Sequence, residues 1–579
     1  MTTPGGLLLP LAVLVPFTGV LVGLVLGGRN AQRVAMVTIA AGLGIAVAIA
    51  VARARSDDTL TYLLGGWAPP LGIALRADGL SVVMMLVVAV VIGGISIYAR
   101  ADFGTPSGVR ELRGSIVYWL LLLAVWGSLN LVFVSGDLFT LYVALELLTF
   151  AGVPLVCLGG EGETLRAALR YLLYALAGSV LYLLGAVLLY GEYGTLDIAL
   201  LAARVRPSPV VWTAAALMTT GLLAKTALFP LHLWLPPAHA GAPPAASAVL
   251  SALVVKGSWF LVIRLWFDVM PGVVTWPSAQ LLGALGAVAI VVGNVVALRQ
   301  ARLKLLIAYS TIAQIGYLFL LFPLAFDAAS GALVRGDALT AGVLQACSHA
   351  TAKAGMFMAA GLLYKAFGHD RIAELAGAAR LAPVSVLAFV VGGIALMGVV
   401  PSGAYLAKKL FFDAADASGQ WWWEAVLQGG GFLTCGYVVL VLAHALKRTD
   451  SPIAPKASVP RLQEVAALAL ALCSLLLAFA VMGPVPAGLL SNPLSPKELG
   501  STLVTIVGGS VLALCLARYL PSLPAIDALI GFASPVRRAT LAVGAMVERA
   551  DGALRQWSVA GISLLVLALL FGAAMAASR

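Results

Sequence analysis

The most apolar stretches of this sequence contain ionisable side chains, and these are the first candidates for chemistry. Glu146, Lys225 and Lys256 each stand within a long apolar run. A charge at bilayer depth costs at least ~2.5–3.5 kcal/mol, so such residues usually mark a pathway. Burial favours loss of a lysine proton, whereas a nearby carboxylate favours its retention. A lysine held between these two influences can load and release a proton, which arginine cannot do.

These residues also have structural interpretations. Glu146 needs a basic partner, which either Lys225 or Arg170 could supply. The resulting ion pair could tune proton transfer or could only fix helix packing. Lys225 and Lys256 could also extend their ammonium groups to the membrane surface, as lysines near helix ends do.

A second candidate is a histidine and a lysine four residues apart, His349 and Lys353. This spacing places both side chains on one face of a helix, and histidine changes charge near neutral pH. A further lysine stands in an apolar stretch near residue 408. The sequence therefore predicts a proton relay with main and secondary members. The main members are Glu146, Lys225, Lys256, Lys353 and Lys408, and the secondary members are His232 and His349.

Prolines interrupt the apolar runs beside two of these lysines. Pro230 and Pro236 follow Lys225, and Pro401 precedes Lys408. Proline removes a backbone donor and clashes with the preceding helical turn. Unpaired backbone at membrane depth is tolerated only inside protein or beside a water-filled cavity. We therefore expect helix breaks at these prolines, with water and free carbonyl groups close to the buried amines.

The elements that position these residues must be membrane helices. The chain of 579 residues is 61% hydrophobic and 11% charged, whereas soluble domains contain about 25% charged residues. About sixteen segments are long and apolar enough to cross a bilayer. They lie near 6–27, 33–52, 79–98, 115–134, 137–158, 167–190, 210–229, 243–266, 277–298, 304–324, 339–364, 382–414, 421–446, 462–483, 500–518 and 557–577.

The interrupted segments occupy matching positions in two sets of five. The fourth segment of each set is the broken one. Because each set has an odd number of helices, the second set crosses the membrane in the opposite direction to the first. The predicted fold is an all-α polytopic membrane protein with two inverted five-helix repeats. The expected divisions are 1–114 (N-terminal helices), 115–266 and 277–446 (repeats), 462–518 (C-terminal helices), 524–556 (an amphipathic lateral helix) and 557–577 (a final transmembrane helix).

The part from 534 to 556 differs from the spanning segments. Ser534 and Pro535 are typical of a helix start, and apolar residues then recur at helical spacing opposite a charged face. Such a helix lies along the membrane surface or along a neighbouring element.

The net charge of +11 does not require a nucleic-acid partner. When the loops are assigned alternately, one side carries more than twice as many Lys and Arg residues as the other. This bias identifies the cytoplasmic side and places both termini on the opposite side of the membrane. The expected location is a bacterial inner membrane. The first apolar run lacks the basic start and the small-residue cleavage site of a signal peptide. We therefore expect it to remain in the protein as a helix.

The five cysteines form no CxxC or Cys/His cluster. The sequence likewise shows no phosphate-binding or dinucleotide-binding glycine motif at a strand-to-helix junction. We expect no bound cofactor and no iron–sulfur, haem or zinc site, so any redox centre would lie on another subunit.

Several phrases in the chain match those of a known family. They are SGDLFTLYVALELL at 135–148, GLLAKTALFPLHLWLPPAHAGAP at 221–243, SAVLSALVVKG at 247–257, LKLLIAYSTIAQIGY at 303–317 and PSGAYLAK at 401–408. The chain resembles the antiporter-like proton-translocating subunits shared by respiratory complex I (NADH-quinone oxidoreductase), membrane-bound hydrogenases, formate hydrogenlyases and Mrp-type cation/proton antiporters. It departs from the family at Pro237, where an acid is usual, at Arg302, where Asp often stands, and at Gln345, where many members have a second histidine.

The resemblance implies a transport subunit of a larger membrane complex. It implies other integral membrane subunits as partners, and protons, with Na⁺ or K⁺ left open, as the transported ions. Protons would pass Glu146, Lys225 and Lys256, cross through Lys353 and His349, and leave near the lysine at 408. One alternative is a membrane subunit of an inorganic-carbon uptake complex with a large zinc protein. A second alternative is a structural subunit that has lost transport.

Overall fold

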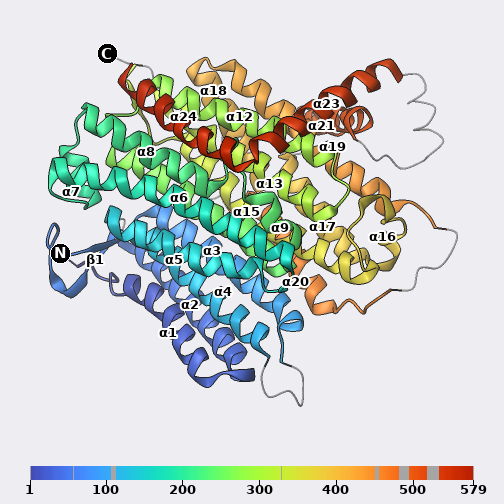
Figure 1. The fold of residues 1–579 in the computed structure, drawn as a ribbon, viewed down its shortest axis with the longest axis horizontal. Coiled ribbons are helices and arrows are strands. Elements are labelled where there is room, and N and C mark those ends of the chain that lie inside the picture. The colour runs from blue at the N-terminus through green and yellow to red at the C-terminus, as the bar shows by residue number, and fades with distance from the viewer. Residues whose placement is uncertain are drawn as a thin grey trace.

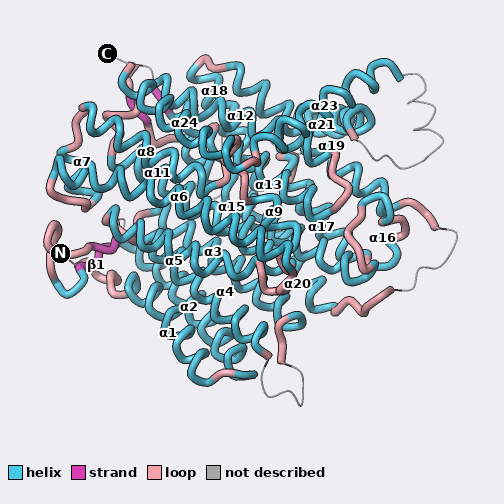
Figure 2. Tube along the Cα trace, in the orientation of Figure 1, coloured by secondary structure: helices cyan, strands magenta, loops and turns pink. Residues whose placement is uncertain are grey.

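The computed structural model describes residues 2–56, 58–105, 112–327, 329–449, 455–480, 495–517 and 534–577. Helices make up most of this part of the chain, and the only described strands are two short antiparallel pairs (Figures 1 and 2). The predicted all-α membrane architecture is confirmed.

Each segment predicted to cross the membrane contains a helix. The N-terminal region contains α1 (Leu8–Leu26), α2 (Gly28–Ser56), β1 (Leu60–Leu63), η1 (Leu64–Gly66), β2 (Ala74–Ala77) and α3 (Gly79–Asp102). The next region contains α4 (Arg113–Val134), α5 (Leu138–Val156), α6 (Gly162–Tyr193), α7 (Ile198–Arg204), α8 (Pro209–Thr226), α9 (Leu235–Gly241), α10 (Pro244–Val249), η2 (Leu250–Val254), α11 (Val255–Ile263) and η3 (Arg264–Val269).

The second half follows a similar plan. It contains α12 (Trp276–Leu298), α13 (Leu303–Phe319), α14 (Leu321–Ala325), β3 (Phe326–Asp327), β4 (Ala332–Leu333), α15 (Asp337–Phe367), η4 (Ile372–Glu374), α16 (Ala378–Leu381), α17 (Pro383–Met397), α18 (Gly403–Ser418) and α19 (Trp421–Leu446). The C-terminal elements are α20 (Arg461–Ala480), α21 (Pro496–Leu516), α23 (Ser534–Leu554) and α24 (Trp557–Ala576).

The expected count of about sixteen spanning helices is not confirmed. Within the described residues, 12 helices are long and apolar enough to cross a membrane. α8 and α15 are absent from this group because lysines and other polar residues dilute their apolar character, and α17 is short because the helix breaks after it. The predicted spans at 462–483 and 500–518 and the predicted lateral helix at 524–556 extend in part beyond the described residues.

Two broken helices share the same local layout. α8 is followed directly by Ala227, which has a φ of 59°, and α17 by Gly398, which has a φ of 67°. Each of these left-handed residues stands three positions before a proline, Pro230 or Pro401. Pro236 instead lies in the first turn of α9, where a missing backbone donor is tolerated.

Closely packed glycines hold each broken helix against its neighbour. Gly221 and Gly392 both stand six residues before the left-handed position. A Cβ on Gly221 would lie 2.2 Å from the carbonyl oxygen of Gly178 on α6, and one on Gly392 would lie 3.0 Å from that of Ala352 on α15. The matching spacing is what repeated five-helix units would produce.

The amphipathic helix α23 packs on its own chain. It lies across α12 and α21, and α24 then packs against α8 (Figure 1, red). Arg299 at the end of α12 donates to Glu548 of α23 at 3.0 Å. The C-terminal helices therefore connect the two halves of the molecule.

Candidate functional site

Lys225 and Glu146 form an ion pair inside the first half. Lys225 lies near the end of α8, where its side chain is 7% exposed, and its Nζ is 3.2 Å from Oε1 of Glu146 on α5. The ammonium group also donates to Thr149 at 2.9 Å and to Ser179 on α6. Of the two basic partners considered for Glu146, the structure brings Lys225 to it.

Lys256 is more completely buried than Lys225 and lies on a helix with a π-helical turn at each end. It is 1% exposed on α11, which lies between the π-helical turns η2 and η3. Its Nζ donates to the carbonyl oxygen of Ser251 at 2.7 Å. That carbonyl belongs to the π-helical turn, where the regular helical bond pattern is altered. The ammonium group is therefore held by a neutral acceptor.

His349 and Lys353 stand on α15 between the two halves, and both are fully buried. Lys353 donates to Ser310 and, at 3.1 Å, to the carbonyl oxygen of Ile307, both on α13. Both ring nitrogens of His349 are buried without a hydrogen-bond partner among the described residues. His349 and Lys353 are four residues apart on α15 and therefore share one face of that helix.

Lys408 stands beside the second helix break. It lies on α18, and its Nζ donates to Oε1 of Gln428 on α19 at 2.9 Å. A Cβ added to Gly431 would lie 3.3 Å from this Nζ, and one added to Gly398 would lie 3.4 Å from Cδ of the same lysine. The lysine therefore packs between a glycine of α19 and the glycine at the break.

A polar connection leads from α15 to this second break. Gln345 donates to Gln314 on α13 at 2.8 Å, and Gln314 donates to the carbonyl oxygen of Leu396 at 3.3 Å. Leu396 lies in the last turn of α17. Gln345 is one of the positions at which the sequence departs from the family it resembles. Its amide continues the polar line from α15 to the second helix break.

His232 contacts a residue far along the chain. Its Nε2 is 2.7 Å from Oδ1 of Asp551 on α23, and both side chains are 1% exposed. Oδ2 of Asp551 also accepts from Tyr309 at 2.7 Å and from Arg555 at 2.9 Å. Burial raises the pKa of Asp551, but the hydrogen bond and charge of His232, together with Arg555 and Tyr309, lower it overall. The lateral helix thus holds a buried carboxylate beside the first helix break.

Sequence reasoning did not identify several polar groups that surround the predicted relay residues. These are Thr149, Ser179, Ser251, Ser310, Gln314, Gln428 and Asp551. Hydroxyl and amide groups are common in membrane helices, so their types carry little signal alone. Lys304 stands beside basic residues typical of a loop, but it is 8% exposed on α13 and donates to the carbonyl oxygen of Ala242 at 3.0 Å.

The matches to known proteins cover the same region as this polar line. The NADH:quinone oxidoreductase/Mrp antiporter transmembrane family matches residues 135–434, just over half of the chain. This chain belongs to that family.

Individual relatives extend the match. The chain is 33% identical to NADH-quinone oxidoreductase subunit N of Desulforudis audaxviator over 446 residues, covering 74% of this chain and 86% of the relative. It is 27% identical to a Na⁺/H⁺ antiporter subunit of Alkalihalophilus pseudofirmus over 442 residues, covering 75% and 86%. These relatives give no support to the carbon-uptake alternative.

The fold has a solved counterpart. The chain matches one chain in the structure of the Mrp complex from a Dietzia species with a TM-score of 0.72 and 23% identity. The match covers 89% of this chain and 98% of that one. The family member is therefore a multi-pass membrane protein with the architecture of a subunit of a membrane complex.

Proposed function

We propose that this chain is a proton-translocating subunit of a multisubunit membrane complex. The observation that carries the proposal is a set of four amines, the buried Lys225, Lys256 and Lys353 and the partly buried Lys408. Each is held by neutral oxygens, and Lys225 contacts one carboxylate in addition. Such amines have a large desolvation cost as ammonium groups and can therefore give up protons at accessible pH.

The proposed route follows these amines through both halves. A proton enters the first half at the pair of Lys225 and Glu146 and passes to Lys256. It crosses through His349 and Lys353 on α15 and leaves near Lys408. His232 is a secondary member whose position depends on Asp551. Pro230 and Pro401 lie in the helix breaks, through which water reaches the amines.

We propose the corresponding organisation of the chain. Residues 115–266 and 277–446 are the two inverted repeats, each with one helix break. The partners are other integral membrane subunits, and an exchanged Na⁺ or K⁺ is the proposed counter-ion where the complex is an antiporter. The location is a bacterial inner membrane, with both termini on the non-cytoplasmic side because the more basic loops face the cytoplasm.

The first test is Lys225→Ala in the assembled complex. We expect loss of proton movement into vesicles with normal assembly, because the amine that loads the proton is gone. The exposed Lys456 supplies the matched control, and Lys456→Ala should transport like the parent. A Lys225→Ala complex that assembles and transports normally would contradict the proposal.

A second test concerns the partners. Purification in mild detergent followed by mass spectrometry identifies the subunits that accompany the chain. Iron–sulfur, nickel or flavin subunits would support redox-driven translocation. Several small hydrophobic subunits without a redox protein would support cation/proton antiport, and a single large zinc protein would restore the carbon-uptake alternative.

A further inference from the structure

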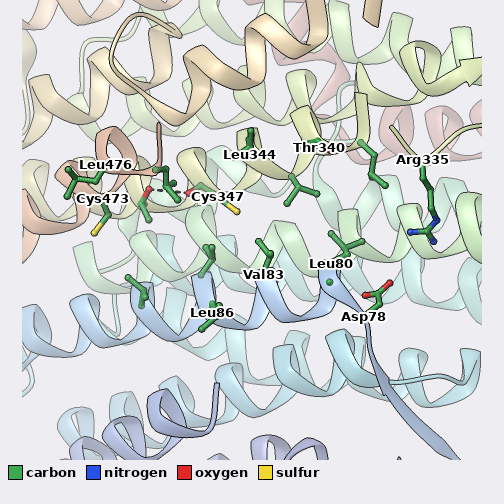
Figure 3. A pocket seen from close by; sticks show the side chains of 17 residues that line it. Asp78, Leu80, Val83, Leu86, Arg335, Thr340, Leu344, Cys347, Cys473 and Leu476 are labelled. Atoms are coloured by element: carbon green, nitrogen blue, oxygen red, sulfur yellow. Dashed lines mark hydrogen bonds between the residues drawn. The ribbon is translucent and has the colours of Figure 1, made fainter. Parts of the chain in front are cut away.

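A long apolar groove lies between α3, α15 and α20, apart from the relay. Its volume is about 820 Å³, within the 300–1,000 Å³ range of ligand sites. Leucine and valine side chains form most of its lining, and Asp78 and Arg335 lie together at one end (Figure 3). Cys473 and Leu476 of α20 lie at the other end (Figure 3).

The length of the groove matches one leaflet of a bilayer. Its lining runs along α3 from Gly79 to Val90 and along α15 from Leu339 to Thr351. At 1.5 Å per residue these stretches are about 16 and 18 Å long. Half of a hydrocarbon core of about 30 Å is about 15 Å. Because α3 and α15 both begin at the charged end, the groove extends from the membrane surface to the middle of the bilayer.

The charged end is suited to a phosphate group. Arg264 holds Asp78 through bonds of 2.6 and 2.7 Å and Asp268 through one of 2.8 Å. Arg335 pairs with Asp268, but its side chain remains 48% exposed. A guanidinium group has five N–H donors, so this half-exposed group has donors left for a phosphate besides those that contact Asp268. Arginine–phosphate pairs are frequently bidentate.

We propose that the groove binds a glycerophospholipid from the leaflet on this side. Its acyl chains lie along α3 and α15, and its phosphate contacts Arg335. The apolar lining recognises the tails, the half-exposed guanidinium recognises the headgroup, and the groove length sets the depth at which the tails end.

The bound lipid has a consequence for the relay, and this step rests on the proposed function. Cys347 and Thr351 line the groove. Residues two positions further along a helix lie about 200° round its axis, so His349 and Lys353 occupy the opposite face of α15. Acyl chains in the groove therefore exclude water from the outer side of the helix that carries the central relay.

The test uses the full chain extracted from membranes that contain a phospholipid with a photoreactive acyl chain. Washing in lipid-free detergent removes exchangeable lipid, and irradiation then attaches the retained lipid to its site. Mass spectrometry of the digested protein locates the attachment. We expect retained lipid on peptides covering 79–90 and 339–351. Absence of retained lipid, or attachment confined to other faces, would overturn the proposal.

Two variants and one control test whether the attachment depends on the groove and on Arg335. Val87→Trp fills the groove and Arg335→Gln removes the headgroup contact, so each should lower the attachment several-fold. Val187→Trp places the same ring on an exposed site of α6 and should leave it unchanged. If Val87→Trp does not fold, the positions of lipid attachment in the wild-type protein and the amount of attachment in Arg335→Gln test the proposal. Attachment that neither variant lowers, or a partner subunit cross-linked within the groove, would overturn the proposal. Because retention is measured without transport, its failure is distinct from failure of the proposed function.

Discussion

Lys225 shows how a single residue can support two charge states in a buried site. Its amine contacts a carboxylate and two hydroxyl groups, contributed by α5 and α6. Glu146 stabilises the ammonium form, whereas the hydroxyl groups of Thr149 and Ser179 can donate to or accept from the amine. Loss of the proton therefore leaves the nitrogen with hydrogen-bond partners. This is the arrangement that a reversible proton carrier requires.

At the residue scale, the pairing of Asp78 with Arg264 makes the stability of the folded protein depend on pH. Burial raises its pKa, but the hydrogen bond and charge of Arg264 outweigh this effect and lower the pKa to about 2. The resulting stability, about 2 kcal/mol, is present above the ordinary aspartate pKa and is lost as pH falls toward 2. We expect the melting temperature in detergent to fall below about pH 4, the ordinary aspartate value.

A neutral variant checks this assignment. Asp78→Asn should melt at a lower temperature at neutral pH and should show a flatter acid response than the parent. The exposed Asp58 supplies the control, and Asp58→Asn should behave like the parent. An unchanged acid response in Asp78→Asn would show that another group is responsible.

At the scale of elements, the close approach of α6 and α8 determines where Lys225 lies. Gly178 and Gly221 let the two backbones meet, and Cγ of Lys225 lies 3.4 Å from a Cβ placed on Gly178. Small residues at helix contacts are the usual means of close packing in membranes. Two glycines, which have no ionisable group themselves, thus determine where Lys225 lies.

Gly221→Ala tests this dependence. The new Cβ would lie 2.2 Å from the Gly178 carbonyl oxygen, so α8 must move away from α6 and carry Lys225 from Glu146. We expect destabilisation of about 1–3 kcal/mol and reduced transport, measured by thermal unfolding and vesicle assays. Gly191 is a helical glycine of α6 with open space around it, so Gly191→Ala should reduce neither stability nor transport. Equal behaviour of the two variants would exclude this packing role.

The elements also show which features a sequence can predict. Spanning helices and proline interruptions follow from local chemistry, so the helix ends near Pro230 and Pro401 were anticipated. The left-handed conformation of Ala227 was not, because a non-glycine residue adopts it only when the surroundings impose it. The π-helical turns on either side of Lys256 were also missed, since no local residue pattern specifies an extra residue per turn.

At the scale of the molecule, α23 connects the C-terminal region to the first helix break. Asp551 and His232 are 319 positions apart in the sequence yet lie 2.7 Å apart. The sequence predicted an amphipathic helix along a neighbour, but it could not name the neighbour because the contact is long-range. The ionisable residues in apolar segments stand out in the sequence by their types, whereas the hydroxyl, amide and Asp551 groups that lie beside them depend on tertiary packing.

Asp551→Ala tests whether this contact holds α23 in place. Removing Asp551 takes away the hydrogen-bond partner of the buried side chains of His232 and Tyr309, and each unsatisfied buried group costs about 1–3 kcal/mol. We therefore expect α23 to become accessible to protease and transport to decline. Arg549→Ala changes an exposed residue of the same helix and should leave both properties unchanged. Protection of α23 equal to the parent in Asp551→Ala would show that apolar packing alone holds it.

In the proposed mechanism, one continuous line of titratable groups joins the two halves through α15. The most direct test is proton translocation by the assembled complex with Lys353→Met, which keeps side-chain length but removes the titratable amine. We expect loss of translocation although Glu146, Lys225 and Lys408 remain unchanged. Translocation at the parent rate in an assembled Lys353→Met complex would contradict the mechanism, because protons would then cross the membrane without passing between the halves.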